Sequence, residues 1–506
     1  MSARLTMPTR CWLPVVIAAC LAGCAVTPYQ RDTDAARRTL DTGCVTYLTE
    51  LDAAVAHAGV GDGMAARVAG FRYARVNRLL ASYAVEPISE PQFKYWAERM
   101  LDLGLQAYQV EIANLPAADA ARLTPSLAAV APAANSLHEG VKICAARLFV
   151  QDLAHAEAQN RLRAAARVPD DYAAWKRVAG LYFLTRIAFA AGVRHWQDET
   201  RDVFARPLFM LPTYGVRIRY APPTVTKDAD VAAIHARSRD NPLRIPQPRG
   251  ADLEALFAMY APEFEVDTVS ADDRAGELGW FGGDMPAVDA GNPVVYRRIS
   301  HTRYQGEALL QLNYSIWFPA RPKTSPRDLL GGNLDGVTWR VTLAPDGSPW
   351  VYDCIHNCGC FHLFFPTARA GLKILPATRD ETAFVPQTLP RVAAGERLTL
   401  RLENGTHYLQ RVIVESADWF YTMSYRFGDD DELRSRPLPE GGRRSIFGPD
   451  GIVRGSERAE RYWFWPMGIA EPGAMRQWGR HATAFVGRRH FDDADLFEKY
   501  FDMKKP

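Results

Sequence analysis

Apolar residues recur at helical spacing through the first two fifths of the chain. Phe93, Trp96, Met100 and Leu103 follow one another at intervals of three or four residues, so that they share one face of a helix. Four further groups have the same spacing: Leu40, Cys44, Tyr47 and Leu51; Val76, Leu79, Leu80 and Tyr83; Leu137, Val141, Cys144 and Leu148; and Trp175, Val178, Ala179 and Tyr182. We interpret these stripes as the core of a bundle of about six helices.

Beyond about residue 290 the pattern becomes that of strands. Residues 309–318 are rich in aromatic and branched side chains, and residues 337–343 alternate between apolar and polar. Turn signals at Ala344–Gly347 and at Asn404-Gly405 separate successive runs, as in β-hairpins. We therefore expect an α+β fold, in which an N-terminal helical bundle is followed by a mostly antiparallel β sandwich or open barrel.

Composition places the chain among globular proteins, since 48% of the residues are hydrophobic and 23% are charged. Sixty basic residues face 58 acidic ones, and two of the basic residues, Arg4 and Arg10, lie in the first 23 positions. The remaining chain carries no basic surplus, which argues against nucleic acid as a partner. The sequence also lacks the serine-hydrolase elbow, the zinc-protease helix motif and the phosphate-binding loop.

The first residues have the pattern of a secretory signal. Arg4 and Arg10 precede an apolar run, Cys11–Leu21, of about 11 residues, and a membrane-spanning helix needs about 20. The run ends in Leu21-Ala-Gly-Cys24, which resembles the lipobox of bacterial lipoproteins at all four positions. The alternative is an ordinary cleaved signal in which the cysteine occurs by chance.

The resemblance covers residues 1–24 and implies an anchor. In lipoproteins the signal is cut before the cysteine, which is acylated with chains such as palmitate, and several chains hold a protein on a bilayer durably. Cys24 is the residue that this implies, and Ala25 in place of Asp implies sorting to the outer membrane, where the protein would face the periplasm. Since no second long apolar run follows, we expect the rest of the chain to be soluble.

A cluster of prolines marks the boundary between the two expected domains. Seven prolines fall within residues 206–250, which favours an extended connection, and a short helix is expected at residues 251–260. We therefore divide the chain into five segments: a signal peptide (1–23), a tether (24–34), a helical domain (35–205), a proline-rich connection (206–250) and a β-rich domain (251–506).

Two cysteines lie on the helical stripes. Cys44 and Cys144 each occupy an apolar face, and an oxidising periplasm would allow them to cross-link the bundle. The alternative is a pair of inert buried thiols.

A second group of cysteines lies with two histidines in the segment 353–362, Asp-Cys-Ile-His-Asn-Cys-Gly-Cys-Phe-His. If Asn357-Cys-Gly359 is a three-residue hairpin loop, His356 pairs with Cys360 and Cys354 pairs with His362. Side chains two positions apart share a face of a strand, so all four would point the same way. Two thiolates and two imidazoles suit zinc or copper.

Alternatives to this metal site remain open. Four ligands on a flat ladder form a rectangle rather than a tetrahedron, so His301 is a candidate additional ligand and Glu307 a candidate general base. The other interpretation is a disulfide between Cys354 and Cys360 beside two histidines of structural role.

An arginine-rich segment, Gly473–Phe491, contains no acidic residue. Its guanidinium groups could bind phosphate or carboxylate groups of lipids and glycans. Asp492, Asp493 and Asp495 follow directly, which favours ion pairing within the chain instead. The candidate anion-binding residues are Arg476, Arg480, Arg488 and Arg489.

Two functions are consistent with these features. The first is a lipid-anchored envelope protein that acts as a binding or structural module. The second is a metal-dependent hydrolase whose site is the Cys/His segment 354–362. A coordination position open to substrate would favour the enzyme, and a closed site or a disulfide would favour the module.

Overall fold

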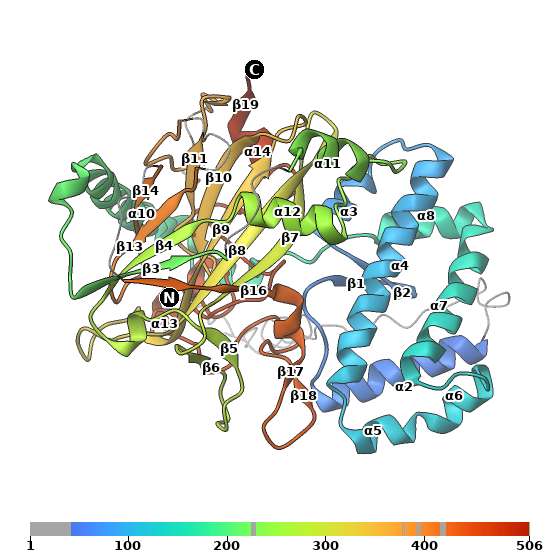
Figure 1. Cartoon of the computed structure of the whole chain (residues 1–506). Helices are drawn as coiled ribbons and strands as arrows, with labels where there is room; N and C mark the ends of the chain where they lie inside the picture. Colours follow the sequence, from blue (N-terminus) through green and yellow to red (C-terminus); the bar gives the residue numbers. More distant parts are fainter. Residues whose placement is uncertain are drawn as a thin grey trace, which may run out of the picture.

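The computed structural model describes residues 42–504, except 224–228, 377, 379, 391, 393–395 and 415–420. Most helices of the first part gather at one end of the molecule, on the right in Figure 1, and two large sheets lie beside them. The fold is therefore mixed α and β, with a helix-rich first part and a strand-rich remainder. The signal peptide and tether predicted for residues 1–34 lie outside the described residues.

The predicted stripes of α2, α4 and α7 pack into one core, to which Leu243, Ile245 and Ala308 of later segments also contribute. A short hairpin, which the sequence analysis did not predict, lies against α4. Gly104 of α4 allows this approach, because a Cβ atom there would lie 1.9 Å from the carbonyl oxygen of Tyr73. The elements are α2 (Thr42–Ala58), β1 (Ala66–Val68), β2 (Phe71–Val76), α3 (Arg78–Tyr83), α4 (Glu90–Ala113), α5 (Ala117–Arg122), α6 (Thr124–Val130), α7 (Leu137–Leu153) and α8 (Ala156–Ala165).

Polar residues define where three of these helices begin. The side chain of Asn77 accepts a hydrogen bond from the backbone N–H of Leu80 at 2.9 Å, and Ser136 caps α7 in the same way. Ser89 and Gln92 form a capping box at the start of α4. Each cap satisfies a backbone donor that has no partner within its helix.

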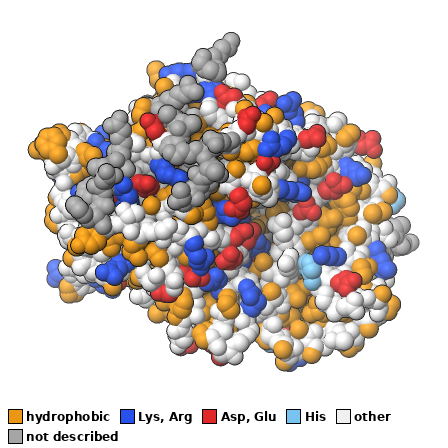
Figure 2. Space-filling model, in the orientation of Figure 1, with side chains coloured by type: hydrophobic (Ala, Val, Ile, Leu, Met, Phe, Trp, Pro, Cys, Tyr) orange, Lys and Arg blue, Asp and Glu red, His pale blue; other side chains and the backbone are white. Residues whose placement is uncertain are grey.

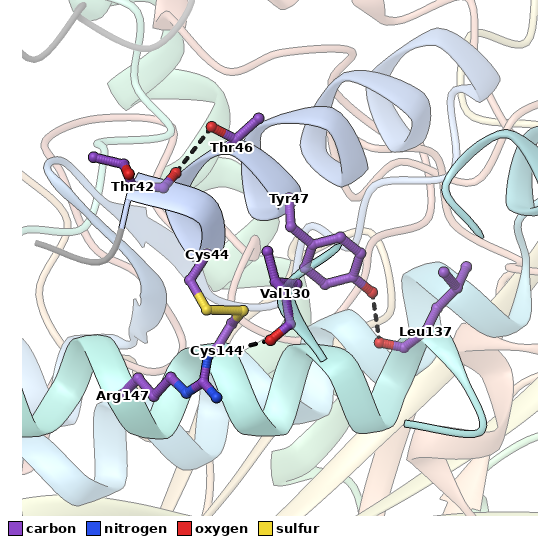
Figure 3. The surroundings of a disulfide bond; sticks show 8 residues. All are labelled: Thr42, Cys44, Thr46, Tyr47, Val130, Leu137, Cys144 and Arg147. Carbon is purple, nitrogen blue, oxygen red and sulfur yellow. Dashed lines mark hydrogen bonds between the residues drawn. A yellow bond between two sulfur atoms is a disulfide. The ribbon is translucent and has the colours of Figure 1, made fainter. Parts of the chain in front are cut away.

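The structure contains the disulfide between Cys44 of α2 and Cys144 of α7, as the sequence analysis expected (Figure 3). The two Cα atoms lie 5.1 Å apart, and both residues are fully buried. The hydroxyl of Tyr47 donates a hydrogen bond to the carbonyl oxygen of Leu137 at 2.8 Å, which joins the same two helices one turn further along. The covalent bond therefore reinforces a packing contact.

Helices α9 (Ala174–Ala179) and α10 (Tyr182–Ala205) do not join this core, although the sequence analysis placed them in the helical domain. Along α10, Trp196 and Phe204 pack against Phe384 and Phe365 of the strand-rich part. The prediction that the stripe beginning at Trp175 is buried in a core is also wrong in part. The exposed fraction of Trp175 is 61% and that of Val178 is 77%. Helical spacing alone does not reveal whether anything covers the apolar face.

The largest sheet has six strands in the order β11-β10-β9-β8-β7-β16, antiparallel except for β16 and β7. A second sheet has five strands in the order β14-β13-β4-β3-β15 and includes two parallel pairs. The strands are β3 (Val216–Ala221), β4 (Glu263–Thr268), β7 (Val294–Tyr304), β8 (Glu307–Arg321), β9 (Gly332–Leu343), β10 (Pro349–His356), β11 (Leu363–Pro366), β13 (Thr399–Leu402), β14 (Leu409–Ile413), β15 (Thr422–Ser424) and β16 (Arg426–Asp429).

An apolar core shared by the two sheets accounts for the strand pattern seen in the sequence. Val337, Trp339 and Val341 alternate along β9 and are all buried in it, together with Phe264 of β4 and Leu400 of β13. The segment 206–250 is not simply an extended connection, because it supplies β3 and the helix α11 (Val231–Ser238). The expected helix at 251–260 is α12 (Gly250–Met259).

Smaller elements complete the strand-rich part. They are β5 (Glu277–Gly279), β6 (Ala287–Asp289), β12 (Ala370–Leu372), β17 (Arg436–Pro437), β18 (Arg443–Arg444), α13 (Arg461–Phe464), α14 (Leu496–Tyr500) and β19 (Phe501–Met503), with short 3-10 turns between them. No helix among the described residues combines the length and the apolar character needed to cross a membrane.

The disulfide makes a testable contribution to stability. Replacing both cysteines, as Cys44→Ala with Cys144→Ala, should lower the free energy of unfolding by up to about 4–5 kcal/mol, because the bond closes a long loop. Urea unfolding with and without reductant measures this: reductant should weaken the native protein and leave the double variant unchanged. Peptide mapping that finds both thiols free in periplasmic material would contradict the assignment.

Candidate functional site

The Cys/His segment forms the predicted three-residue loop at the end of β10. The N–H of His356 donates to the carbonyl oxygen of Cys360 at 3.0 Å, and the N–H of Gly359 donates to that of His356 at 2.7 Å. Gly359 has a φ of +92°, which a residue without Cβ adopts at no steric cost. The loop Asn357-Cys-Gly359 is therefore as the sequence predicted.

The strand that returns from this loop is shifted by one residue. Phe361 has a φ of +59°, which interrupts the extended backbone directly after the loop. In consequence Cys354 pairs with Leu363 instead of His362. A shift of one residue moves a side chain to the opposite face of a sheet. The expectation that Cys354, His356, Cys360 and His362 share a face is therefore wrong.

His356 lies on the face of β10 that points toward the core shared by the two sheets. Its Nδ1 is 3.6 Å from Oδ1 of Asp335 on β9, and Asp335 also contacts His407 Nδ1 at 2.9 Å and Arg458 at 3.3 Å. Burial by itself would raise the pKa of Asp335, but Arg458 and the two imidazoles hold it well below its ordinary value. The imidazole of His356 thus belongs to a buried ionic cluster.

His362 lies on the other face, against a buried ion pair. Its Nε2 is 2.8 Å from Oδ2 of Asp353, and Asp353 accepts hydrogen bonds from both Nε and Nη2 of Arg340, at 2.9 and 2.6 Å. Burial lowers the pKa of His362 to about 3 against the opposing effect of Asp353, so the ring is neutral. Its Nδ1 faces the hydroxyl of Thr483 at 3.4 Å. Both ring nitrogens therefore have partners within the chain.

The three cysteines of the segment are free thiols in two different places. Cys354 is buried in the core between the sheets, where burial raises the pKa of its thiol well above the ordinary value. Cys358 and Cys360 lie in a separate apolar cluster with Met475, and their thiols hydrogen-bond to each other. Cys354 and Cys360 do not form a disulfide. The thiol that contacts Cys360 is that of Cys358.

The remaining candidates for a metal or catalytic role lie elsewhere. Nε2 of His301 is 2.6 Å from the carbonyl oxygen of Pro246. Glu307 is held by Arg239 at 2.9 Å at the exposed start of β8. Among the described residues, no group of three or more His, Cys, Asp or Glu side chains is arranged to hold a metal ion. Neither zinc nor copper therefore finds the expected ligand set.

Sequence reasoning missed the ionic cluster around Asp335, which extends to the loop between β13 and β14. His407 from that loop stacks on Phe318 at 3.9 Å, and its Nε2 is 3.5 Å from Asp273. These residues are far apart in the sequence, so no local spacing could reveal them. The cavity beside His356 measures about 20 Å³, which holds one water molecule and no substrate. The cluster is closed.

Each arginine of the C-terminal segment has a partner within the chain. Arg476 donates to the carbonyl oxygen of Cys358 at 3.0 Å, and so fastens the segment to the Cys/His loop. Arg480 pairs with Asp171, Arg488 with Asp170 and Arg489 with Glu381. The segment therefore pairs within the chain, as expected, but its arginines pair with acidic residues from other segments. Asp492 and Asp493, the expected partners, pair with Arg78 instead.

Two surface clefts have charged linings that are largely engaged. One of about 980 Å³ lies beside α11, where Arg237 pairs with Asp252 and Arg239 with Glu307. The other, of about 550 Å³, lies between α3 and the chain before α14, and there Arg303 pairs with Glu86. Salt bridges within the chain compete with any charged ligand at both places.

A different surface carries large apolar side chains that nothing described covers. We call it the α9–α10–α13 surface. Figure 1 shows α10 on the left of the molecule, and Figure 2 shows hydrophobic side chains interspersed with charged ones over the face in view. The helices pack together through the turn that follows α13, and Phe189 of α10 meets Phe464 of α13 at 5.4 Å. The exposed fractions lie between 53% and 77% for Trp175, Val178, Phe183, Leu184, Ile187, Tyr462 and Trp463.

No protein-family model, no curated protein and no solved structure matches this chain. His356, His362 and the three cysteines of the segment 353–362 are buried, and the exposed Glu307 pairs with Arg239, whereas the side chains of the α9–α10–α13 surface are open to solvent.

The thiol contact predicts which disulfide the loop can form. Mild oxidation should remove two hydrogen atoms from the peptide that contains Cys354, Cys358 and Cys360, and intact-peptide mass measures this loss. The loss should persist in Cys354→Ser and vanish in Cys358→Ser, because the thiol of Cys358 hydrogen-bonds to that of Cys360, whereas Cys354 lies in a different core. If the loss instead vanished in Cys354→Ser and persisted in Cys358→Ser, the disulfide would be between Cys354 and Cys360.

The buried histidines predict a pH dependence of stability. The pKa of His481 is lowered to about 3 by burial, so this residue stabilises the fold above its ordinary pKa of about 6.5 and loses that contribution as pH falls toward 3. His481→Gln should therefore reduce the slope of unfolding free energy against pH between about 6 and 4, by up to about 1.4 kcal/mol per unit.

Chemical unfolding at several pH values provides the measurement. His195→Gln is the matched control, because His195 is exposed on α10 and should leave the slope unchanged. Equal slopes in native protein and His481→Gln would show that His481 is protonated normally in the folded state.

Proposed function

We propose that this protein is a lipid-anchored envelope protein of the outer membrane, facing the periplasm, and that its folded part is a non-catalytic binding module. The lipobox at Leu21-Ala-Gly-Cys24 supports the anchor, and the disulfide between Cys44 and Cys144 fits an oxidising compartment. In this proposal a helical bundle precedes a β sandwich, and the two together form the scaffold of the binding surface.

The exposed α9–α10–α13 surface is the observation that carries the binding role. Soluble proteins seldom leave contiguous large apolar patches uncovered unless the patch meets a partner. Seven large side chains on three adjoining helices are exposed here. A module that binds through this face needs no catalytic group.

The alternative, a metal-dependent hydrolase at residues 354–362, has no comparable support. It needs a metal with an open coordination position and a nearby carboxylate base. His356 and His362 project from opposite faces of the sheet and each contacts an aspartate, and Glu307 pairs with Arg239. Metal analysis of the purified protein would revive this alternative if it found stoichiometric zinc or copper.

The anchor is tested by Cys24→Ser. The variant should fail to incorporate labelled palmitate and should be released from membranes by an alkaline carbonate wash, whereas the native protein is retained. Labelling and retention equal to those of the native protein would show that Cys24 is not the lipid attachment site.

Sorting within the envelope is tested by Ala25→Asp. Aspartate at this position should keep the lipidated protein in the inner membrane, by the sorting pattern that the lipobox resemblance implies. Separation of the two membranes on a sucrose gradient measures the shift. An unchanged outer-membrane fraction would contradict the sorting proposal and leave the lipid anchor intact.

A further inference from the structure

We propose that the α9–α10–α13 surface docks on the phospholipid bilayer to which Cys24 tethers the chain, so that the protein lies against the membrane. This inference rests on the proposed lipid anchor. It assigns to the open face one occupant, the interfacial layer of a bilayer, in place of a second protein.

The exposed face of α10 changes character along the helix. Near its start the outward side chains are Phe183, Leu184 and Ile187, and further along they are Arg194 and His195, followed by further charged residues. Only Phe204 of this helix is buried, although the helix has 24 residues. Its first half therefore presents apolar side chains outward on one face, while Tyr182 and Phe189 pack against the small core around Met467 on the other.

The base of the surface is rigid. The guanidinium of Arg177 donates to the carbonyl oxygens of Met467 and Gly487 at 2.8 and 2.6 Å. It also lies over the rings of Tyr172 and Tyr182, at 4.7 and 4.3 Å from their centroids. Cation–π contacts of this kind add to the hydrogen bonds. The exposed side chains thus project from a fixed platform, which lowers the entropy cost of docking.

The side chains around the surface suit a bilayer interface. Trp175, Tyr462 and Trp463 combine a large apolar ring with a polar edge, and such side chains concentrate at the level of lipid headgroups. The ammonium of Lys176 lies 5.9 Å from the ring of Trp175, and the guanidinium of Arg461 lies 4.9 Å from that of Tyr462. Two of the three aromatic side chains therefore have a cation beside them. Lys176 can reach lipid phosphates, whereas Arg461 also pairs with Glu471 at 3.1 Å.

The length of the chain before α2 brings the bilayer within reach. Residues 25–41 separate Cys24 from α2, and a chain of that length spans at most about 60 Å. A body held this close meets the bilayer at high effective concentration, so that even modest affinity of the surface leads to docking. A soluble protein partner has no such advantage.

The experiment uses the mature chain from Ala25 to Pro506 without lipid, which keeps every described residue. It is mixed with vesicles of phosphatidylethanolamine that contain phosphatidylglycerol as the minor lipid, and flotation separates bound from free protein. The test variant is Trp175→Ser/Ile187→Ser/Trp463→Ser, three exposed positions whose change leaves the cores intact. The control is Val85→Ser/Val269→Ser/Ile374→Ser, three apolar residues outside the surface that are on average more exposed than the test positions.

We expect the native sequence and the control to float with the vesicles, also at high salt. The affinity of the test variant for the vesicles should be at least about tenfold lower. Circular dichroism confirms that both variants are folded. Flotation of the test variant equal to that of the native sequence overturns the proposal, as does a native chain that stays at the bottom of the gradient at about millimolar lipid, the effective concentration that a short tether provides.

Sedimentation analysis of the same samples separates the other occupants. A dimer that the test variant cannot form, without vesicle binding, would assign the surface to a second copy of this chain and overturn docking on lipid. The proposed function fails on different evidence, since labelling of Cys24→Ser with palmitate does not depend on the surface. A lipidated protein that does not dock therefore loses this inference and keeps the anchor.

Discussion

The buried ion pair between Arg340 and Asp353 is the constraint on which the strand-rich part depends. Both side chains are fully enclosed on one face of the six-stranded sheet, and a buried charge without its partner costs several kcal/mol. The pair must therefore be covered and fully hydrogen-bonded. The C-terminal segment does this: the carbonyl oxygen of Phe491 accepts from Arg340, whose guanidinium lies 3.6 Å from the centre of the Phe491 ring.

The same ion pair explains the position of His362 in the Cys/His segment. Oδ2 of Asp353, which already accepts from Arg340, accepts a second hydrogen bond from His362, because the backbone at Phe361 turns the following residue to that face. A histidine that could have bound a metal thereby serves the ion pair. Metal binding and hydrogen bonding in the protein interior compete for the same imidazole. In this fold the imidazole completes the hydrogen bonds of the interior.

The α9–α10–α13 surface presents the opposite situation. Its side chains are apolar and open to solvent, and nothing in the folding of the described residues requires them, because the helix cores and the sheets are complete without them. Exposed apolar area of this kind is a disadvantage for a freely diffusing protein, since it promotes association. On a protein tethered as we propose, the bilayer that holds the anchor would be the partner of this surface.

Local sequence patterns determined those features that depend on neighbouring residues. Helical spacing located the stripes of α4 and α7, alternation located β9, and Gly359 marked the left-handed position of its loop. The pairing of Cys44 with Cys144 followed from two cysteines on two apolar faces. Each of these rests on propensity and periodicity, which act over a few residues.

Only the tertiary structure decided which face each side chain occupies and whether that face is covered. One residue with positive φ separated His356 from His362, and no spacing rule anticipates it. The partners of Arg480 and the exposure of Trp175 depend on segments hundreds of residues away. A periodic pattern states that a face is apolar, but burial depends on what the rest of the chain brings to that face.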